Sequence, residues 1–213
     1  GKYAEAEALY AQCQAIEEEV LGPEHPSLAT TLHNLAGLLR SQARPGKYEE
    51  ARALHQRSHS IFEKALGPNH PDVATSLTSL AGLLQSQGKY AEAEPLYARS
   101  HAIQERVLGR EHPGLIVFLH NWAAFLEMQG KYEEAERLCE RSLAISEKAL
   151  GPDHPHVASS QHTLAGLLMS QGKYAAAGPL YARCQAIQET VLGPEHPRLA
   201  TTLSNWAALL YEQ

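Results

Sequence analysis

The sequence has too few basic residues for a nucleic-acid or anionic-membrane surface. Lys and Arg number 18 against 24 Asp and Glu, a formal net charge of −6, whereas such surfaces need clustered Lys and Arg. The chain also lacks a run of about 18 apolar residues, which excludes a transmembrane helix. Residues 1–5 do not show the basic-then-apolar pattern of a signal peptide. We therefore expect neither nucleic acid nor a membrane as partner.

Cysteine is scarce, and its spacing matches neither a metal site nor a disulfide framework. Cys13, Cys139 and Cys184 form no CxxC pair, and such an odd set fits a reducing compartment. We interpret all three as small apolar packing residues and expect a cytoplasmic protein. Hydrophobic residues make up 44% of the chain, which is enough to bury a core.

An internal repeat organises the whole chain. The segment Gly-Lys-Tyr begins at residues 1, 46, 88, 130 and 172, so the later intervals are 42 residues (88 − 46, 130 − 88, 172 − 130) and the first is 45 (46 − 1). The additional residues are Ala43-Arg44-Pro45. We predict a single solenoid made of the units 1–45, with its insertion at 43–45, 46–87, 88–129, 130–171 and 172–213.

Each unit carries the patterns of two amphipathic helices. In the third unit, apolar residues recur at spacings of three and four over 90–108 and again over 115–126. Gly109 suits a left-handed helix end, and Pro113 suits the start of the next helix. Residues 129–131 form the tight turn into the next unit. Because neither helix can bury its apolar stripe alone, neighbouring pairs have to stack around a continuous core.

The residues that carry the family resemblance lie on both sides of the Gly-Lys-Tyr turn. The pattern Leu77-x-x-Leu80-Ala81-x-x-Leu84, followed by Gly88-Lys89-Tyr90-x-x-Ala93-x-x-x-Tyr97, resembles the tetratricopeptide repeat. Other units repeat it, although Gln161 stands in the fourth where the others have leucine. The common repeat of the family has 34 residues. The 42-residue period, with Leu-Gly-Pro-x-His-Pro between most units, resembles the longer variant of kinesin light chains and related bacterial arrays.

This resemblance implies an all-α, right-handed superhelical solenoid of antiparallel helix pairs. In the family's register the chain opens with a lone second helix and closes with a lone first helix, so we expect a segment of a longer array with uncapped ends. The insertion 43–45 should lengthen the turn inside the first pair, and Pro95 and Pro179 should disturb their second helices. An armadillo or HEAT array, whose period is similar, is the alternative architecture.

The resemblance also implies that the first helix of each pair lines the concave wall, where a peptide would bind. Only Arg40 and Glu127 are charged among the outward positions. Gly or Ala recurs in mid-helix there, although glycine costs about 1 kcal/mol relative to alanine; either a ligand backbone or another helix could approach closely. The outward positions are Thr30, His33, Asn34, Gly37 and Arg40; Thr75, Thr78, Ser79, Gly82 and Gln85; Val117, His120, Asn121, Ala124 and Glu127; Ser159, His162, Thr163, Gly166 and Met169; Thr201, Ser204, Asn205, Ala208 and Tyr211.

Three asparagines occupy one register of these first helices. Asn34, Asn121 and Asn205 match the position from which family members hydrogen-bond the main chain of a bound peptide, and an amide offers both donor and acceptor. The alternative is a solvated polar side chain. Basic residues that clamp a terminal carboxylate in some relatives are absent, so we expect no specific grip on an acidic C-terminus.

No motif indicates catalysis, a cofactor or a metal. HExxH, GxSxG and phosphate- or dinucleotide-binding patterns are absent. A histidine precedes the recurring proline once per unit, and stacked repeats should hold these side chains about 10 Å apart, too far to share an ion. We expect helix-start or loop-packing roles for His25, His70, His112, His154 and His196, and core packing for Trp122 and Trp206.

The sequence therefore favours a protein-interaction scaffold that binds an extended peptide or a partner protein, without enzymatic activity or cofactor. The alternative is a purely structural array that self-associates through its uncapped ends. RNA binding by helical repeats needs a basic groove, and the near-neutral wall disfavours it.

Overall fold

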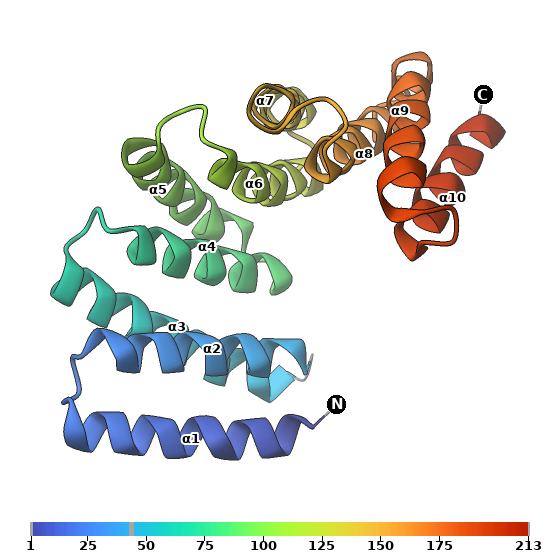
Figure 1. Cartoon of the computed structure of the whole chain (residues 1–213). Coiled ribbons are helices and arrows are strands. Elements are labelled where there is room, and N and C mark those ends of the chain that lie inside the picture. The colour runs from blue at the N-terminus through green and yellow to red at the C-terminus, as the bar shows by residue number, and fades with distance from the viewer. Residues whose placement is uncertain (1, 43–44, 213) are drawn as a thin grey trace. The chain divides into compact units, whose positions relative to one another are not determined.

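The computed structural model describes residues 2–42 and 45–212, which fold into helices joined by short loops (Figure 1). The chain divides into two compact units, Gly1–Val107 and Leu108–Gln213. Within each unit successive helices run antiparallel, so that a first helix and the second helix after it form a hairpin. No strand occurs in the described ranges. The predicted all-α architecture of antiparallel helix pairs is confirmed.

The first unit contains α1 (Tyr3–Val20), α2 (Pro26–Ser41), α3 (Pro45–Leu66), α4 (Pro71–Ser86) and α5 (Tyr90–Leu108). Its main core cluster joins one pair to the next: Leu32 of α2 packs with Ile61 of α3, Leu77 of α4 and Ile103 of α5. All four side chains are buried. Stacking of successive pairs therefore buries the apolar stripes, as the sequence predicted.

The second unit contains the short 3-10 helix η1 (Pro113–Leu115), α6 (Ile116–Met128), α7 (Tyr132–Leu150), α8 (Pro155–Ser170), α9 (Tyr174–Leu192) and α10 (Pro197–Glu212). Here Val157 and Ala158 of α8 pack against Cys184 and Ile187 of α9, with Leu143 of α7 beside them. A hairpin and the second helix before it thus share one core.

A histidine caps the N-terminus of α2, α4, α8 and α10, and His112 caps η1, which precedes α6. Nδ1 of His70 accepts a hydrogen bond from the backbone N–H of Asp72 at 3.2 Å, which satisfies one of the free donors at the start of α4. The intervening Pro71 has no N–H to satisfy. The same bond recurs at His25, His112, His154 and His196. The predicted role of these histidines at helix starts is confirmed.

Glycine closes three of the turns inside the pairs. Gly88, Gly130 and Gly172 each have a φ of 73°, a left-handed conformation that disfavours side chains. In the first of these turns the N–H of Lys89 donates to the carbonyl of Leu84 at 2.9 Å. This six-to-one bond satisfies a free carbonyl at the end of α4 and turns the chain into α5.

The inserted residues do not simply lengthen the corresponding turn of the first pair. Ala43 and Arg44 lie outside the described residues, but Pro45 begins α3, which has 22 residues where α5, α7 and α9 have 19. Proline is favoured at the first helical position because its missing N–H needs no partner there. Part of the insertion therefore extends α3 at its N-terminus. The expectation that the whole insertion lengthens the turn is wrong for Pro45.

The predictions made from the sequence for the cysteines, the tryptophans and the two mid-helix prolines have mixed outcomes. Cys139 and Cys184 are buried as predicted, and burial raises the pKa of the Cys139 thiol to about 12. For Cys13 the packing prediction is wrong: it is exposed because no described helix covers that face of α1. Trp122 and Trp206 are half-buried, with the Trp122 ring 5.7 Å from that of Phe118. Pro95 and Pro179 lie inside continuous helices.

Candidate functional site

The outward positions of the first helices lie on α2 and α4 in the first unit and on α6, α8 and α10 in the second. We call these two sets of positions the candidate wall of each unit. Every member keeps part of its surface accessible. The exposed members are Thr30, Asn34, Arg40, Thr75, Val117, Asn121, Ala124, Thr201, Ser204, Ala208 and Tyr211. The half-buried members are His33, Gly37, Thr78, Ser79, Gly82, Gln85, His120, Glu127, Ser159, His162, Thr163, Gly166, Met169 and Asn205.

The wall histidines connect neighbouring first helices. Nε2 of His120 on α6 lies 3.1 Å from the hydroxyl of Ser160 on α8, and Nε2 of His162 on α8 lies 3.2 Å from the Asn205 amide on α10. His33 makes a longer contact of 3.4 Å with Ser79 between α2 and α4. These side chains hold one repeat to the next within each unit.

Burial also keeps the wall histidines neutral. It lowers the pKa of His120 to about 4 and lowers the pKa of His33 and of His162. An uncharged imidazole can donate from one ring nitrogen and accept at the other, which suits the hydroxyl and amide partners found here. The histidines therefore add hydrogen-bonding capacity to the wall without adding charge at neutral pH.

The mid-helix glycines of the wall differ in how closely other side chains approach them. A Cβ atom added to Gly37 would meet no atom within 4 Å. At Gly166 the nearest group is the Tyr181 hydroxyl at 3.7 Å, an ordinary contact, and at Gly82 it is the flexible end of Arg40 at 3.2 Å. None of these neighbours is the backbone of another helix. The alternative that glycine admits a close helix is therefore wrong at Gly37, whereas side chains of neighbouring helices lie against Gly82 and Gly166.

Two of the three asparagines have no side-chain partner within the described part of the chain. The amides of Asn34 and Asn121 are exposed, whereas Asn205 is half-buried and contacts His162. Glu127, one of the two charged members, accepts a hydrogen bond from Ser170 at 2.7 Å. The sequence-predicted set thus separates into residues that bridge repeats and residues that face outward.

His55 contributes to the site region but was missed by the sequence analysis. Its ring lies edge-on to that of His33, with centroids 5.0 Å apart, and burial lowers the pKa of His55 to about 3. The corresponding contact in the second unit joins His162 and Tyr181, with centroids 5.6 Å apart. The sequence feature that could have indicated this contact is the spacing of the two residues. His162 and Tyr181 are 19 residues apart (181 − 162), and the insertion increases the corresponding spacing of His33 and His55 to 22 (55 − 33).

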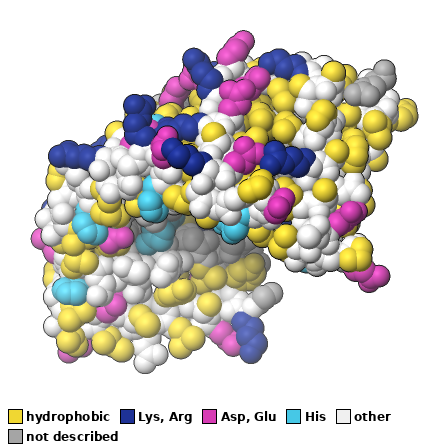
Figure 2. All heavy atoms as spheres, turned by 45° about the horizontal axis from the view of Figure 1, so that its top comes forward, with side chains coloured by type: hydrophobic (Ala, Val, Ile, Leu, Met, Phe, Trp, Pro, Cys, Tyr) yellow, Lys and Arg dark blue, Asp and Glu magenta, His cyan; other side chains and the backbone are white. Residues whose placement is uncertain are grey.

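Charge is mixed on the visible surface. Figure 2 shows Lys and Arg side chains interspersed with Asp and Glu rather than gathered into a patch of one sign. Within residues 2–42 and 45–212, no group of three or more His, Cys, Asp or Glu side chains could hold a metal ion. None of the helices in those ranges is both long enough and apolar enough to cross a membrane.

The hairpin geometry, the left-handed glycine turns and the cores shared between neighbouring pairs define a tetratricopeptide-type repeat array. The tetratricopeptide repeat family model matches residues 1–47, 43–106, 77–121, 115–168 and 156–213. These matches together span the sequence, so the chain belongs to the tetratricopeptide repeat family. Such arrays are in general protein-interaction scaffolds rather than enzymes.

Solved structures point to the kinesin-light-chain type of this repeat. A protein of Podosopora anserina with nearly identical TPR-like repeats, assigned as a kinesin light chain, is 33% identical; the match covers 89% of each chain with a TM-score of 0.75. A structure of that protein with one substitution is 32% identical over 90% of this chain and 89% of that chain, with a TM-score of 0.77. The longer repeat variant inferred from the sequence is confirmed.

A more distant likeness concerns the fold alone. BtubC (BKLC) from P. vanneervenii is 20% identical, and the match covers 99% of this chain and 82% of that chain with a TM-score of 0.80. No curated protein sequence matches the chain.

Proposed function

We propose that the chain binds an extended segment of a partner protein along the candidate wall. The observation that carries this proposal is the mid-helix glycine of each wall, Gly37 and Gly82 in the first unit and Gly166 in the second, which no backbone of another helix approaches within 4 Å. Each costs about 1 kcal/mol of helix stability relative to alanine, and at Gly37 a Cβ atom would meet no atom within 4 Å. A ligand main chain can approach such positions closely.

The outward-facing groups indicate recognition of main-chain atoms. The exposed amides of Asn34 and Asn121 can each donate to a carbonyl and accept from an N–H. Arg40 and Glu127 are the charged members of the wall, and Glu127 already accepts from Ser170. The ligand is therefore held by its backbone and by small apolar contacts rather than by a terminal carboxylate.

A peptide-display selection against the purified chain tests this proposal. Ala124, which is exposed on α6, is replaced by arginine to block the wall of the second unit. The matched control is Ala186→Arg, an exposed position on the second helix α9. Peptides that bind the wall of the second unit should be lost with Ala124→Arg and retained with Ala186→Arg. Equal enrichment by both variants would contradict a site on the wall of the second unit.

A second measurement addresses the asparagine register. Asn121→Ala should weaken a wall-bound peptide by about 1 kcal/mol because one hydrogen-bonding side chain is lost. Isothermal titration with a peptide from the display selection measures this change. An unchanged isotherm would show that the ligand does not use Asn121.

End-to-end self-association is a second candidate function, favoured by the exposed stripe of α1. Ile16 is 53% exposed and Val20 is 71% exposed, whereas Ile187, in the register of Ile16, is 4% exposed. At the other end, Leu210 of α10 is also exposed. A first helix from one copy and a second helix from another can complete a hairpin and cover both stripes.

Light scattering over a range of concentrations tests this alternative. Ile16→Glu should abolish any concentration-dependent increase in mass, whereas Ala15→Glu, at an exposed position about 100° around α1 from Ile16, should not. A monomeric mass at every concentration measured would contradict self-association and would leave the peptide-binding proposal unaffected.

A further inference from the structure

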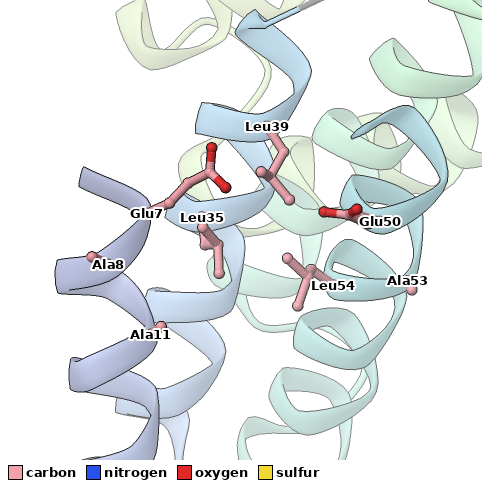
Figure 3. Close-up of a pocket in the computed structure, with 8 residues that line it drawn as sticks. All are labelled: Glu7, Ala8, Ala11, Leu35, Leu39, Glu50, Ala53 and Leu54. Carbon is pink, nitrogen blue, oxygen red and sulfur yellow. The ribbon is translucent and has the colours of Figure 1, made fainter. Parts of the chain in front are cut away.

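A hollow in the first unit lies on the side of α2 away from the candidate wall. Its volume is about 560 Å³, and α1, α2 and α3 line it (Figure 3). Leu35 and Leu39 each stand two residues from Gly37, which is about 160° around a helix of 3.6 residues per turn. The side of α2 that faces the hollow is thus nearly opposite the side that carries the wall. We call this hollow the alanine pocket.

Small side chains make room for the pocket. Ala8 and Ala11 of α1 and Ala53 of α3 line it, while Leu35, Leu39 and Leu54 supply its apolar surface. Larger side chains occupy the same registers farther along the chain. Gln56 and Pro95 correspond to Ala11 and Ala53 between α3 and α5, and Arg137, Glu140 and Pro179 correspond to Ala8, Ala11 and Ala53 between α7 and α9.

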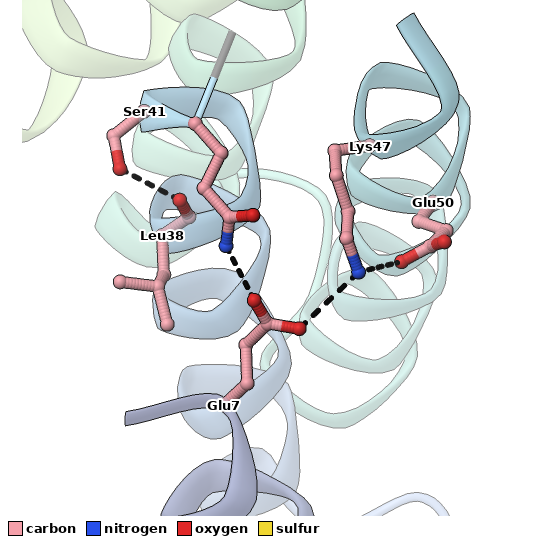
Figure 4. A network of polar contacts seen from close by, with 6 residues as sticks. Glu7, Leu38, Ser41, Lys47 and Glu50 are labelled. Atoms are coloured by element: carbon pink, nitrogen blue, oxygen red, sulfur yellow. Dashed lines mark hydrogen bonds and ion pairs between the residues drawn. The ribbon is translucent and has the colours of Figure 1, made fainter. Parts of the chain in front are cut away.

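Both charged residues that line the pocket are acidic. Figure 3 shows the carboxylates of Glu7 and Glu50 at one end, on α1 and α3. The Lys47 ammonium lies 3.2 Å from Glu7 and 3.0 Å from Glu50, and Gln42 also donates to Glu7 (Figure 4).

Glu50 can accept a further cation. Its side chain is 56% exposed, and within the described ranges its carboxylate bonds only to Lys47. A carboxylate has about four lone-pair sites, so Lys47 does not saturate it. An apolar cavity therefore lies beside an accessible negative charge.

We propose that the alanine pocket holds a bulky apolar side chain of a protein partner, with a neighbouring Lys or Arg of that partner on Glu50. The apolar side chain is buried against Leu35, Leu39 and Leu54. The ammonium or guanidinium group pairs with the Glu50 carboxylate at the mouth. Exposed ion pairs change affinity by about two- to fivefold, so the apolar contact supplies the affinity and the charge supplies the selectivity.

The test titrates three pentapeptides, acetyl-Ala-X-Trp-X-Ala-amide with X as Lys, Gln or Glu, into the full chain carrying ¹³C-labelled leucine methyl groups. We expect saturable shifts of the Leu35, Leu39 and Leu54 methyl signals. The Lys peptide should bind about two- to fivefold more tightly than the Gln peptide, and the Glu peptide should bind most weakly. Glu50→Gln should remove the difference between the Lys and Gln peptides.

A variant that fills the pocket distinguishes binding in the alanine pocket from nonspecific binding of the peptides elsewhere on the chain. Ala53→Leu places apolar volume inside the pocket and should abolish the shifts, whereas Ala98→Leu, on the exposed side of α5, should preserve them. Helical spectra of both variants check their folding. Absence of saturable shifts, or unchanged shifts in Ala53→Leu, overturns the site. Equal affinity of the three peptides overturns the assigned partner chemistry.

Discussion

In the second unit the Arg183 guanidinium donates to the Glu147 carboxylate at 2.8 Å and so ties α9 to α7. The same pair joins α5 to α3 in the first unit, where Arg99 donates to Glu63. The partners are 36 residues apart in both cases. The Arg99 hydrogen bond lowers the pKa of Glu63 below its usual range. One pair of second helices in each unit is therefore joined by an ion pair at the same register.

The Arg183–Glu147 ion pair should contribute little to stability because both side chains are partly exposed. Arg183→Ala should lower the free energy of unfolding by about 0.5 kcal/mol at low salt, and the loss should shrink at about 1 M salt, where screening acts within roughly 3 Å. Urea unfolding of both single variants and the double variant with Glu147→Ala measures the coupling. Strictly additive effects would contradict a direct interaction.

Gln161 should be a point of weakness in the second unit. It is 0% exposed, and neither its amide nitrogen nor its oxygen has a hydrogen-bond partner among the described residues. Since a buried unpaired polar group costs about 1–3 kcal/mol, Gln161→Leu should raise the free energy of unfolding by a similar amount, measured by urea denaturation. The reverse change at the same register of the first unit, Leu77→Gln, is the control and should be destabilising. A neutral or unfavourable Gln161→Leu would mean that the amide is satisfied.

Acid should destabilise the chain through its buried histidines. Burial lowers the pKa of His55 to about 3 and that of His120 to about 4, while both titrate near 6.5 when unfolded. The unfolded state therefore binds protons first as pH falls below 6.5, and each histidine should cost about 2 kcal/mol of stability at pH 5. The loss continues until pH reaches the folded-state values.

A single substitution can test the His55 contribution to this pH dependence. Tyr181 occupies the same register in the second unit and lies edge-on to His162, so tyrosine should fit beside His33. Urea midpoints of His55→Tyr at pH 7.5 and pH 5 should differ less than those of the wild type. An equal difference in both proteins would exclude His55 as a source of the acid sensitivity.

The capping histidines should behave as replaceable hydrogen-bond acceptors. His70→Ala removes the bond to the Asp72 N–H and should cost about 1 kcal/mol of stability, whereas His70→Asn should restore most of it because asparagine is a preferred cap. Thermal unfolding of the two variants at pH 7.5 compares them. Equal losses would indicate that the ring acts by packing instead of by accepting that bond.

The helices and turns could largely be predicted from the periodicity, because each repeat of about 42 residues contains both amphipathic helix patterns and both turns. Gly88 and Pro113 marked a turn and a helix start correctly, since their backbone preferences are local. The extension of α3 was missed because a Gly-Lys-Tyr segment can be turn or helix, and here the preceding Pro45 begins the helix. Local sequence does not decide between these outcomes.

The residues of the candidate wall were assigned from the family resemblance, and their internal contacts could not be predicted from the sequence. Helical spacing placed His120 and His162 outward, yet their bonds to Ser160 and Asn205 depend on how neighbouring repeats are set against each other. The pairing of His33 with His55 needed the same information, with the insertion included. The alanine pocket could not be predicted from the sequence, because alanine is a common residue in any helix and does not indicate a cavity.

The equal φ of Gly88, Gly130 and Gly172 has a consequence for the history of the gene. Unequal exchange between two Gly-Lys-Tyr segments 42 residues apart adds or removes one whole unit and leaves both joints with the same conformation. Copy number can then change in a single genetic event without a new loop having to be selected. The first repeat, residues 1–45, is the exception. Its three inserted residues, 43–45, make its connection to the next repeat different in sequence and length, so it cannot be exchanged so freely.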